Sequence, residues 1–350
     1  MSNEQYDVAV DDGHDGIKIC AGFDQKGKAM CTHTKSRCMH GIHHVVAVGG
    51  GSINKTYLTE GEHYTTTDAG ALANYEETRK SDYQVSPMNR VLVQHALLRA
   101  GFGGKRVRIT AGLPMSDYFR GEGKNDALIQ SKMDNLLIPV SPLQADVQPV
   151  VIESVDVRAE GVMAYFDLAY KADGSVDEEF QRMHRRRPLA VVDLGGKTLN
   201  IVVVTEGENK GIYQQRSGSA LIGALEFRDS VADALRARFN LQGTPPADYV
   251  EEAIMTAVFE IHGREEDVSE LVAAARSAFA SRITSEITRR IGHGDDLAGM
   301  VFAGGGVELL GKEAWAAKVY PGRVIVPEEP VYANARGMYK ASLLAQAMQD

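Results

Sequence analysis

The chain has 350 residues and a formal net charge of -9. This acidic balance argues against direct binding to duplex DNA, because DNA-binding proteins normally carry a clustered basic surface. No window holds the roughly 18 apolar residues of a membrane span, and the polar start MSNEQYD is unlike a signal peptide, so we expect a cytoplasmic protein without membrane contact. The length suffices for two domains, or for one large domain with a divided core.

Three cysteines leave an odd count, which favours reduced thiols over a disulfide framework. Two of them lie in the stretch CTHTKSRCMHGIHH, from Cys31 to His44, which also carries four histidines. Zinc sites usually pair tight ligand doublets across a longer spacer. The stretch therefore favours a solvated strand and loop over a metal site, and metal analysis of the purified protein distinguishes the two.

The first pattern along the chain is a hairpin. Tyr6–Val10 is a short apolar strand, Asp11–Gly16 (DDGHDG) is a polar glycine turn, and Ile17–Phe23 is a second strand. Beyond it, apolar spacing predicts helices at Arg90–Ala100 and Gly161–Tyr170, and strands at Val107–Ala111 and Ser154–Val157.

A second hairpin is expected at Leu189–Val204 (LAVVDLGGKTLNIVVV). Its centre, Gly196 to Thr198, looks like the end of a phosphate-binding P-loop. A P-loop needs a further glycine five residues before its Gly-Lys pair, and that position is Val191. The β-branched run after Thr198 belongs on a strand and not at the start of a helix. The stretch is therefore strand, glycine turn, strand.

The two hairpins repeat one layout about 180 residues apart. Each has an apolar strand ending in Asp, then a glycine turn, then a strand. Two such turns facing one cleft can hold a phosphate chain from both sides, because glycine lets the backbone approach closely. In the rest of the chain we expect helices at Leu221–Phe239, Asp248–Glu260, Val268–Ile291 and Ala333–Met348, and a strand at Met300–Ala303 that runs into a triple glycine.

The ordered set DDGHDGIK, AEG, VVDLGGKTLNI and FAGGGVELL resembles the actin, Hsp70 and sugar-kinase ATPase superfamily. Within it, the chain is most similar to the bacterial plasmid-segregation actins of the ParM/StbA family, and the similarity extends to NRVLVQHALLRAG, VRITAGLPMSDYF and ANARGMY. The resemblance implies an α/β, actin-like two-domain ATPase fold, in which each domain is a mixed sheet flanked by helices and the nucleotide lies in the interdomain cleft. We expect domain I at residues 1–182, with 326–350 returning to it, and domain II at 183–325.

The resemblance also implies roles for single residues. Glu160 and Asp193 are the expected catalytic residues, with Glu160 orienting the attacking water. Asp11 and Asp193 are expected to hold Mg²⁺ through its waters, which that ion gives up reluctantly. The expected nucleotide ligands are Asp11, Gly13, Lys18, Gly195, Gly196 and Thr198 at the phosphates, Gly304, Gly305 and Gly306 at the adenosine, and Glu226 at the ribose. The cofactors implied are ATP or ADP, with GTP as an alternative, and Mg²⁺.

Several of these residues also have a purely structural reading. Glu160 alone would serve as a cap for the helix expected after it, and a single Asp-Gly-Gly turn is ordinarily just a hairpin turn. Four positions depart from the family's usual residues: His14, Asp15, Lys197 and Asn200. They bear on the phosphate contacts, the nucleotide preference and the hydrolysis rate.

The function implied is a nucleotide-dependent, filament-forming ATPase, stimulated by polymerisation, that segregates plasmid DNA. Its partners would be further copies of itself, joined head to tail, and a DNA-binding adaptor, because the acidic filament need not touch DNA. The alternative is a small-molecule (sugar or metabolite) kinase of the same superfamily. A chaperone-like ATPase is not expected, because Hsp70-type chains carry a peptide-binding domain after the ATPase. The polar tract Gly51–Thr67 suits either a contact with a neighbouring subunit or an ordinary surface hairpin.

Overall fold

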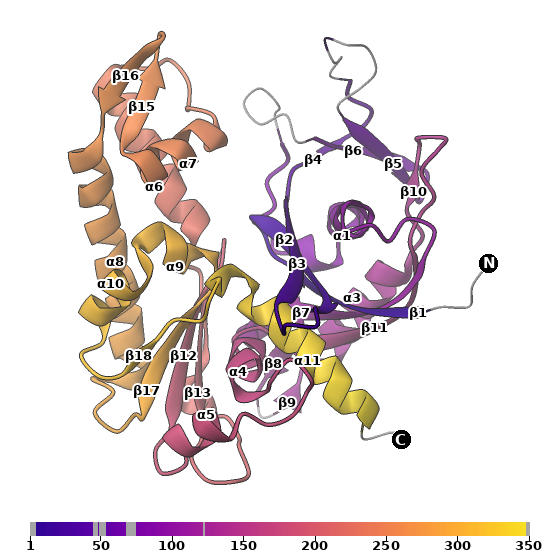
Figure 1. Ribbon diagram of the computed structural model, residues 1–350. Helices are drawn as coiled ribbons and strands as arrows, with labels where there is room; N and C mark the ends of the chain where they lie inside the picture. Colours follow the sequence, from indigo (N-terminus) through magenta and orange to yellow (C-terminus); the bar gives the residue numbers. More distant parts are fainter. Residues whose placement is uncertain (1–4, 45–47, 49–53, 68–74, 122, 348–350) are drawn as a thin grey trace.

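The computed structural model describes residues 5–44, 48, 54–67, 75–121 and 123–347 (Figure 1). Two five-stranded mixed sheets dominate it, one in each of two domains. The first three residues of the polar tract Gly51–Thr67, residues 51–53, lie outside the described residues. In the described part of the chain, no helix is long and apolar enough to cross a membrane.

The first sheet has the strand order β11-β7-β1-β2-β3. Strands β1 and β2 form the antiparallel hairpin expected from the sequence, whereas β7 and β11 run parallel to β1. Their bounds are β1 Gln5–Asp12, β2 Gly16–Phe23, β3 Ala29–Lys35, β7 Arg106–Leu113 and β11 Val151–Ala159.

The second sheet has the order β14-β13-β12-β17-β18 and repeats this plan. Strands β12 and β13 form the second expected hairpin, and β17 and β18 continue the sheet in parallel. The bounds are β12 Leu189–Leu194, β13 Leu199–Val204, β14 Gly218–Ala220, β17 Gly299–Ala303 and β18 Val324–Ile325. Every residue of β12 and β13 is buried, which accounts for their continuous apolar sequence.

Helices cover the first sheet and join it to the second. The expected helices are α1 (Pro87–Arg99), α4 (Val162–Ala169) and α11 (Ala333–Ala347). α11 returns from the end of the chain to pack against α4 and β1. A Cβ added at Gly337 would lie 1.7 Å from the Met163 carbonyl oxygen, so the close contact of α11 with α4 requires glycine there. α4 also packs on β12, and one hydrophobic core runs from the first sheet to that face of the second.

A smaller sheet with the order β10-β5-β6-β4 lies beside α1. Its β5–β6 hairpin occupies the described part of the polar tract. The bounds are β4 Cys38–His40, β5 Lys55–Thr59, β6 Glu62–Thr66 and β10 Ser141–Pro142. The remaining elements of this half are η1 Tyr83–Val85, α2 Met115–Tyr118, β8 Phe119–Arg120, β9 Gly123–Lys124, α3 Asp126–Leu137 and α5 Glu178–Met183.

The second domain adds a group of helices and a small hairpin. They are α6 Ala224–Phe239, α7 Ala247–Thr256, β15 Val258–Ile261, β16 Arg264–Asp267, α8 Ser269–Ile291, α9 Gly305–Leu310 and α10 Lys312–Val319, with short turns η2 Gln214–Arg216 and η3 Pro330–Tyr332. The prediction that the helix at Asp248 continues to Glu260 was wrong at its end. The helix stops at Thr256, because Ala257 turns left-handed (φ 60°) and Val258–Ile261 pairs with β16.

The fold confirms the actin-like two-domain architecture expected from the sequence. The exact boundaries at residues 182/183 and 325/326 stay a prediction.

Candidate functional site

A cavity of about 380 Å³ lies between the two domains. The first domain lines it with Asp15, Lys18 and Lys35, and the second with both glycine pairs, Gly195-Gly196 and Gly305-Gly306. Five of the residues expected at the nucleotide therefore meet at one cavity: Lys18, Gly195, Gly196, Gly305 and Gly306.

The turns of the two hairpins approach each other at this cavity. A Cβ added at Gly196 would lie 2.9 Å from the Cβ of Asp15, so glycine is needed for this approach. Lys18 stands opposite Asp11 in the β1–β2 pairing, and its Nζ lies 3.4 Å from an Asp11 oxygen. The same Nζ would lie 2.9 Å from a Cβ added at Gly13. Lys18 is thus held over the first turn, beside the backbone of Gly13.

The expected catalytic carboxylates are buried behind the turns. Asn200 stands opposite Asp193 in the β12–β13 pairing, and its Nδ2 lies 3.2 Å from Oε2 of Glu160 and 3.2 Å from Oδ2 of Asp193. One side-chain amide therefore donates to both carboxylates. Burial, together with the charges of Asp11 and Asp193, raises the pKa of Glu160 well above its usual range. Burial also raises the pKa values of Asp193 and Asp11.

Asn334, at the start of α11, joins this cluster. Its Nδ2 donates to Oδ2 of Asp193 at 2.9 Å, and its Oδ1 accepts from the Gly161 amide at 2.9 Å. Gly161 has a φ of 75°, and an added Cβ would meet the side chains of Val202 and Asn200. The segment after Glu160 therefore passes directly against the second hairpin. Asn334 was not expected at the site, although the ANARGMY motif contains it and its polar side chain was the available signal.

A buried ion pair between Lys132 and Asp12 was also not expected from the sequence. Lys132 of α3 places its Nζ 2.8 Å from both carboxylate oxygens of Asp12, and Asn89 of α1 donates to the same carboxylate at 2.8 Å. Lys132 also donates to the Gly112 carbonyl at 2.5 Å. Asp12 therefore anchors the end of β1, whereas its neighbour Asp11 pairs with Lys18, which lines the cavity.

The triple glycine packs against β12. Gly304 has a φ of 90°, and an added Cβ would lie 2.7 Å from Oδ1 of Asp193 and 2.4 Å from the Leu194 carbonyl oxygen. A Cβ on Gly306 would collide with the Leu194 side chain. These glycines let α9 begin directly beside Asp193, with Gly305 facing the cavity.

The other expected site residues do not themselves line the cavity: Asp11, Gly13, Glu160, Asp193, Thr198, Glu226 and Gly304. Thr198 is buried, and its carbonyl accepts from the Gly195 amide to close the second turn at 2.9 Å. The carbonyls of Gly195 and Gly196 accept from the first amides of α6, Ala224 and Leu225. Glu226 directs its carboxylate to Arg282 in an exposed ion pair. Its expected role at the ribose stays a prediction.

The unusual residues of the first turn are turned away from the cavity or neutralised. His14 Nδ1 donates to the Thr78 carbonyl at 2.7 Å, and burial lowers its pKa to about 4. Asp15 lies 3.4 Å from Arg228. Burial would raise the pKa of Asp15, but the charges of Lys35 and Arg228 outweigh burial and lower it. Asp15 therefore faces cations, and the repulsion expected between an acid and phosphate is reduced.

Ion pairs join the domains at the outer rim of the cleft. Lys35 contacts Glu251 at 2.6 Å, and Arg79 contacts Asp229 at 2.5 Å. Arg37 pairs with Asp248 in the same region. Each pair joins a cation of the first domain to a carboxylate on α6 or α7 of the second.

The Cys31–His44 stretch forms β3, β4 and the loops beside them. Across the described ranges, no three His, Cys, Asp or Glu side chains gather closely enough to hold a metal ion directly. Cys31 stands opposite Cys20 on β2, and His40 pairs with Glu62.

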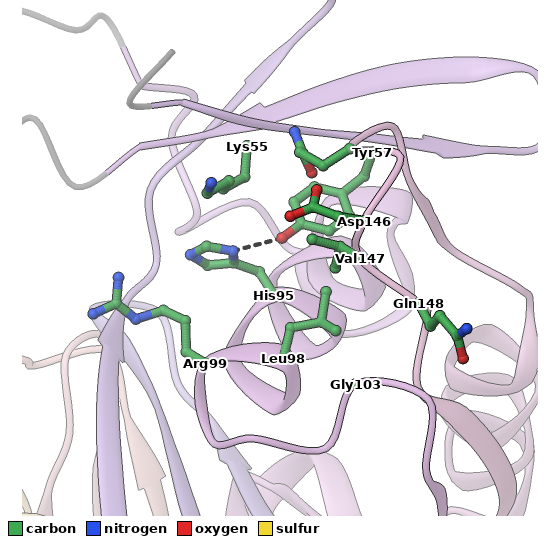
Figure 2. A pocket seen from close by; sticks show the side chains of 10 residues that line it. Lys55, Tyr57, His95, Leu98, Arg99, Gly103, Asp146, Val147 and Gln148 are labelled. Atoms are coloured by element: carbon green, nitrogen blue, oxygen red, sulfur yellow. Dashed lines mark hydrogen bonds between the residues drawn. The ribbon is translucent and has the colours of Figure 1, made fainter. Parts of the chain in front are cut away.

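A separate cavity of about 490 Å³ lies between α1, β5 and the loop at 144–148 (Figure 2). The hydroxyl of Tyr57 lies 2.7 Å from Nδ1 of His95 in its wall. None of the residues expected at the nucleotide lines this cavity, so it is distinct from the interdomain site.

Comparison with known protein families matches residues 6–171 to the N-terminal domain of the plasmid segregation protein ParM (StbA). Residues 191–314 match the C-terminal domain of the archaeal actin homologue MreB-like family. Both matches are to actin-like proteins, and the match of the first half of the chain is to the ParM/StbA family. No curated protein matches this chain in sequence.

Solved structures of actin-like proteins share the fold of this chain at low sequence identity. The archaeal actin homologue Ta0583 aligns with a TM-score of 0.75 and 18% identity, covering 96% of this chain and 99% of that one. Its complex with ADP aligns with a TM-score of 0.73 and 17% identity, at 96% and 99% coverage. A 15-stranded ParM filament from Clostridium botulinum aligns with a TM-score of 0.74 and 16% identity, at 98% and 99% coverage.

Proposed function

We propose that this protein is a nucleotide-dependent, filament-forming actin-like ATPase that segregates plasmid DNA through a DNA-binding adaptor. The observation that carries the proposal is the interdomain cavity, where two glycine turns and Lys18 meet in front of three buried carboxylates. The structural likeness to a ParM filament and to an ADP complex of an archaeal actin homologue supports it.

The residues around the cavity fit a magnesium nucleotide. Backbone amides of the glycine turns suit phosphate oxygens, and Lys18 brings a positive charge to the same place. Asp11 and Asp193 carry the oxygen ligands that Mg²⁺ prefers. Among the described residues, no three acidic, His or Cys side chains form a direct metal cage, which fits an ion held through its waters. Bound Mg²⁺ would supply positive charge at the phosphates. ATP is the favoured nucleotide, and GTP is the alternative.

Glu160 is the proposed group that orients the attacking water. Phosphoryl transfer to water depends mainly on positioning and on charge stabilisation, so one carboxylate fixed near the terminal phosphate suits the task. Asn200 holds one oxygen of Glu160 through its amide, which leaves the other oxygen to accept from water. Asn200 thereby acts as a positioning residue for Glu160.

The nucleotide would control assembly because it lies between the two domains. Bound ATP can bias their relative angle, and a head-to-tail contact that spans both domains responds to that angle. Such a heterologous contact does not close and produces open filaments. The acidic net charge is consistent with a filament that reaches DNA only through an adaptor.

Sedimentation of the purified protein with ATP, with ADP and without nucleotide tests this proposal. We expect pelleted filaments with ATP above a critical concentration, and little pellet without nucleotide. A protein that stays a small soluble species under all three conditions, and that phosphorylates a sugar, would instead support the kinase.

Nucleotide titration of Asp193→Ala tests the metal role. Loss of this carboxylate should weaken binding of Mg²⁺-ATP, because the carboxylate supports the metal before reaction. Binding without Mg²⁺ should change much less. Wild-type affinity of the variant for Mg²⁺-ATP would contradict the assignment.

A further inference from the structure

The β15–β16 hairpin presents an acidic outer face. Phe259 of β15 is buried against the domain, so the alternation of a strand turns Val258 and Glu260 outward. In the pairing with β16, Glu260 stands opposite Glu265 and Val258 stands opposite Asp267. Three exposed carboxylates therefore share one face: Glu260, Glu265 and Asp267. In the described part of the chain, none of the three forms an ion pair with Lys or Arg.

The opposition of Glu260 and Glu265 is unfavourable within the monomer. Like charges directly opposite each other across two strands destabilise a hairpin. A cationic surface placed against this face would remove the repulsion. The hairpin stands at the tip of the second domain, above α7, where such a surface can reach it (Figure 1).

A hollow of about 590 Å³ beside the start of β12 holds more arginines than carboxylates. Arg186, Arg187 and Arg216 line it, together with Glu206 and Asp296. Arg216 donates to both oxygens of Asp296 at 2.6 and 2.9 Å, and the Tyr213 hydroxyl lies 3.1 Å from both oxygens of Glu206. Both carboxylates therefore have hydrogen-bond donors within the chain, but of the two only Asp296 forms an ion pair.

Arg186 and Arg187 give the hollow its excess of positive charge, since Arg216 is paired with Asp296 and Glu206 is the other carboxylate in the lining. Both are exposed, and no ion pair to either is found among the described residues. They directly precede β12, which starts at the end of the domain farthest from β15 and β16 (Figure 1). A guanidinium fork is suited to carboxylates, which it can bind through two parallel hydrogen bonds.

We propose that the acidic hairpin face of one copy docks in the arginine-lined hollow of the next copy. This inference rests on the proposed filament function and names one of its contacts. Because the two surfaces differ and lie at opposite ends of one domain, their contact repeats head to tail and leaves a free surface of each kind at the two filament ends. Charge attraction also speeds the approach of the matching ends.

Charge reversal tests the contact with built-in rescue. One variant carries Glu260→Arg with Glu265→Arg, and the other carries Arg186→Glu with Arg187→Glu. Each alone should raise the critical concentration for ATP-dependent pelleting about tenfold or more, because both surfaces of each variant then have the same sign. An equimolar mixture should assemble at nearly the wild-type critical concentration. In a filament in which the two variants alternate, each reversed hairpin meets a reversed hollow and each unchanged hairpin meets an unchanged hollow. The pellet should therefore contain both variants equally.

A matched control carries Asp126→Arg with Asp134→Arg, a pair of exposed carboxylates on α3 of the other domain. It makes the same charge change as the hairpin variant and should leave the critical concentration within about twofold. Thermal unfolding of every variant checks that it is folded. If wild-type protein assembles and the reversed variants assemble equally well, or if mixing gives no rescue, this contact is wrong while the filament function stands. If wild-type protein forms no assembly with ATP, the proposed function and this contact fall together.

Discussion

At the base of the cleft the two domains meet through buried hydrogen bonds, whereas at its rim they meet through ion pairs that solvent reaches. Asn200 of the second domain bonds Glu160 of the first, and its Oδ1 accepts from the Met115 amide at 3.1 Å. At the rim, the side chains of Arg79 and Asp229 are 33% and 47% exposed. Breaking a bond at the base leaves buried polar groups unpaired, while a rim pair exchanges its partner for water at little cost.

This difference indicates how the cleft opens. Separating the domains at the base requires breaking buried hydrogen bonds, which costs much free energy. The ion pairs at the rim are individually weak and are screened by salt. We therefore expect the domains to rotate about the base while the rim pairs separate. The buried carboxylates would then keep their arrangement as nucleotide enters and leaves.

The largest expected effect is on catalysis at the base. Glu160→Ala should slow ATP hydrolysis by roughly 10²- to 10⁴-fold, because a positioned carboxylate acts mainly in the transition state. Nucleotide binding and filament assembly should persist. Phosphate release measures the rate, with Asp229→Ala at the rim as the control, which should stay close to wild type. Unchanged phosphate release by Glu160→Ala would show that the base does not carry the chemistry.

The next largest effect is expected in the pH dependence of the free energy of unfolding. Folding lowers the pKa of His14 from 6.5 to about 4, so between these values the unfolded chain binds a proton that the folded chain does not. Stability should therefore fall as pH drops from about 6.5 to about 4, by up to roughly 3 kcal/mol from this residue. Urea unfolding of wild type and His14→Gln at several pH values measures it. Equal pH dependence of the two proteins would contradict the assignment.

Asn200→Asp tests the base by replacing the bridging amide with a third acid. The change removes both donated hydrogen bonds and adds a carboxylate beside Glu160 and Asp193, so we expect a loss of about 2 kcal/mol in the free energy of unfolding. Ser219→Ala is the control because it adds no charge. It removes one hydroxyl, which donates to Asn200 at 2.6 Å and accepts from the Ser116 amide at 3.0 Å, and it should cost about 1 kcal/mol. An Asn200→Asp variant as stable as wild type would mean that the amide is not needed.

The smallest effect is expected at the rim. Arg79→Ala should lower the free energy of unfolding by less than about 1 kcal/mol at low salt. The difference from wild type should vanish near 1 M salt, where the Debye length is about 3 Å. Urea unfolding at both salt concentrations measures this. A large, salt-independent loss would place Arg79 with the base contacts.

The sequence predicted the parts of the site that local patterns encode. Both hairpins follow from apolar strands around glycine turns, and their pairing places Asp11 opposite Lys18 and Asp193 opposite Asn200. The pairing of Asp12 with Lys132 could not be predicted, because 120 residues separate the partners and no periodicity relates them. The ion pairs at the rim could not be predicted for the same reason, because their partners are also far apart in the sequence.

Two other differences arise from contacts between elements. The sequence predicted that the helix from Asp248 continues to Glu260, whereas Val258–Ile261 pairs with β16 and is a strand. Asn334 acts on Asp193 from 141 residues away, through the return of α11 to the first domain. Both depend on tertiary contacts that override local preference.

Light scattering after a limited pulse of ATP tests the central claim most directly. The account predicts that scattering by wild-type protein rises and then decays as the nucleotide is hydrolysed, and that scattering by Glu160→Ala rises and stays high. Scattering that never rises at tens of micromolar protein, or that rises equally without nucleotide, would contradict it.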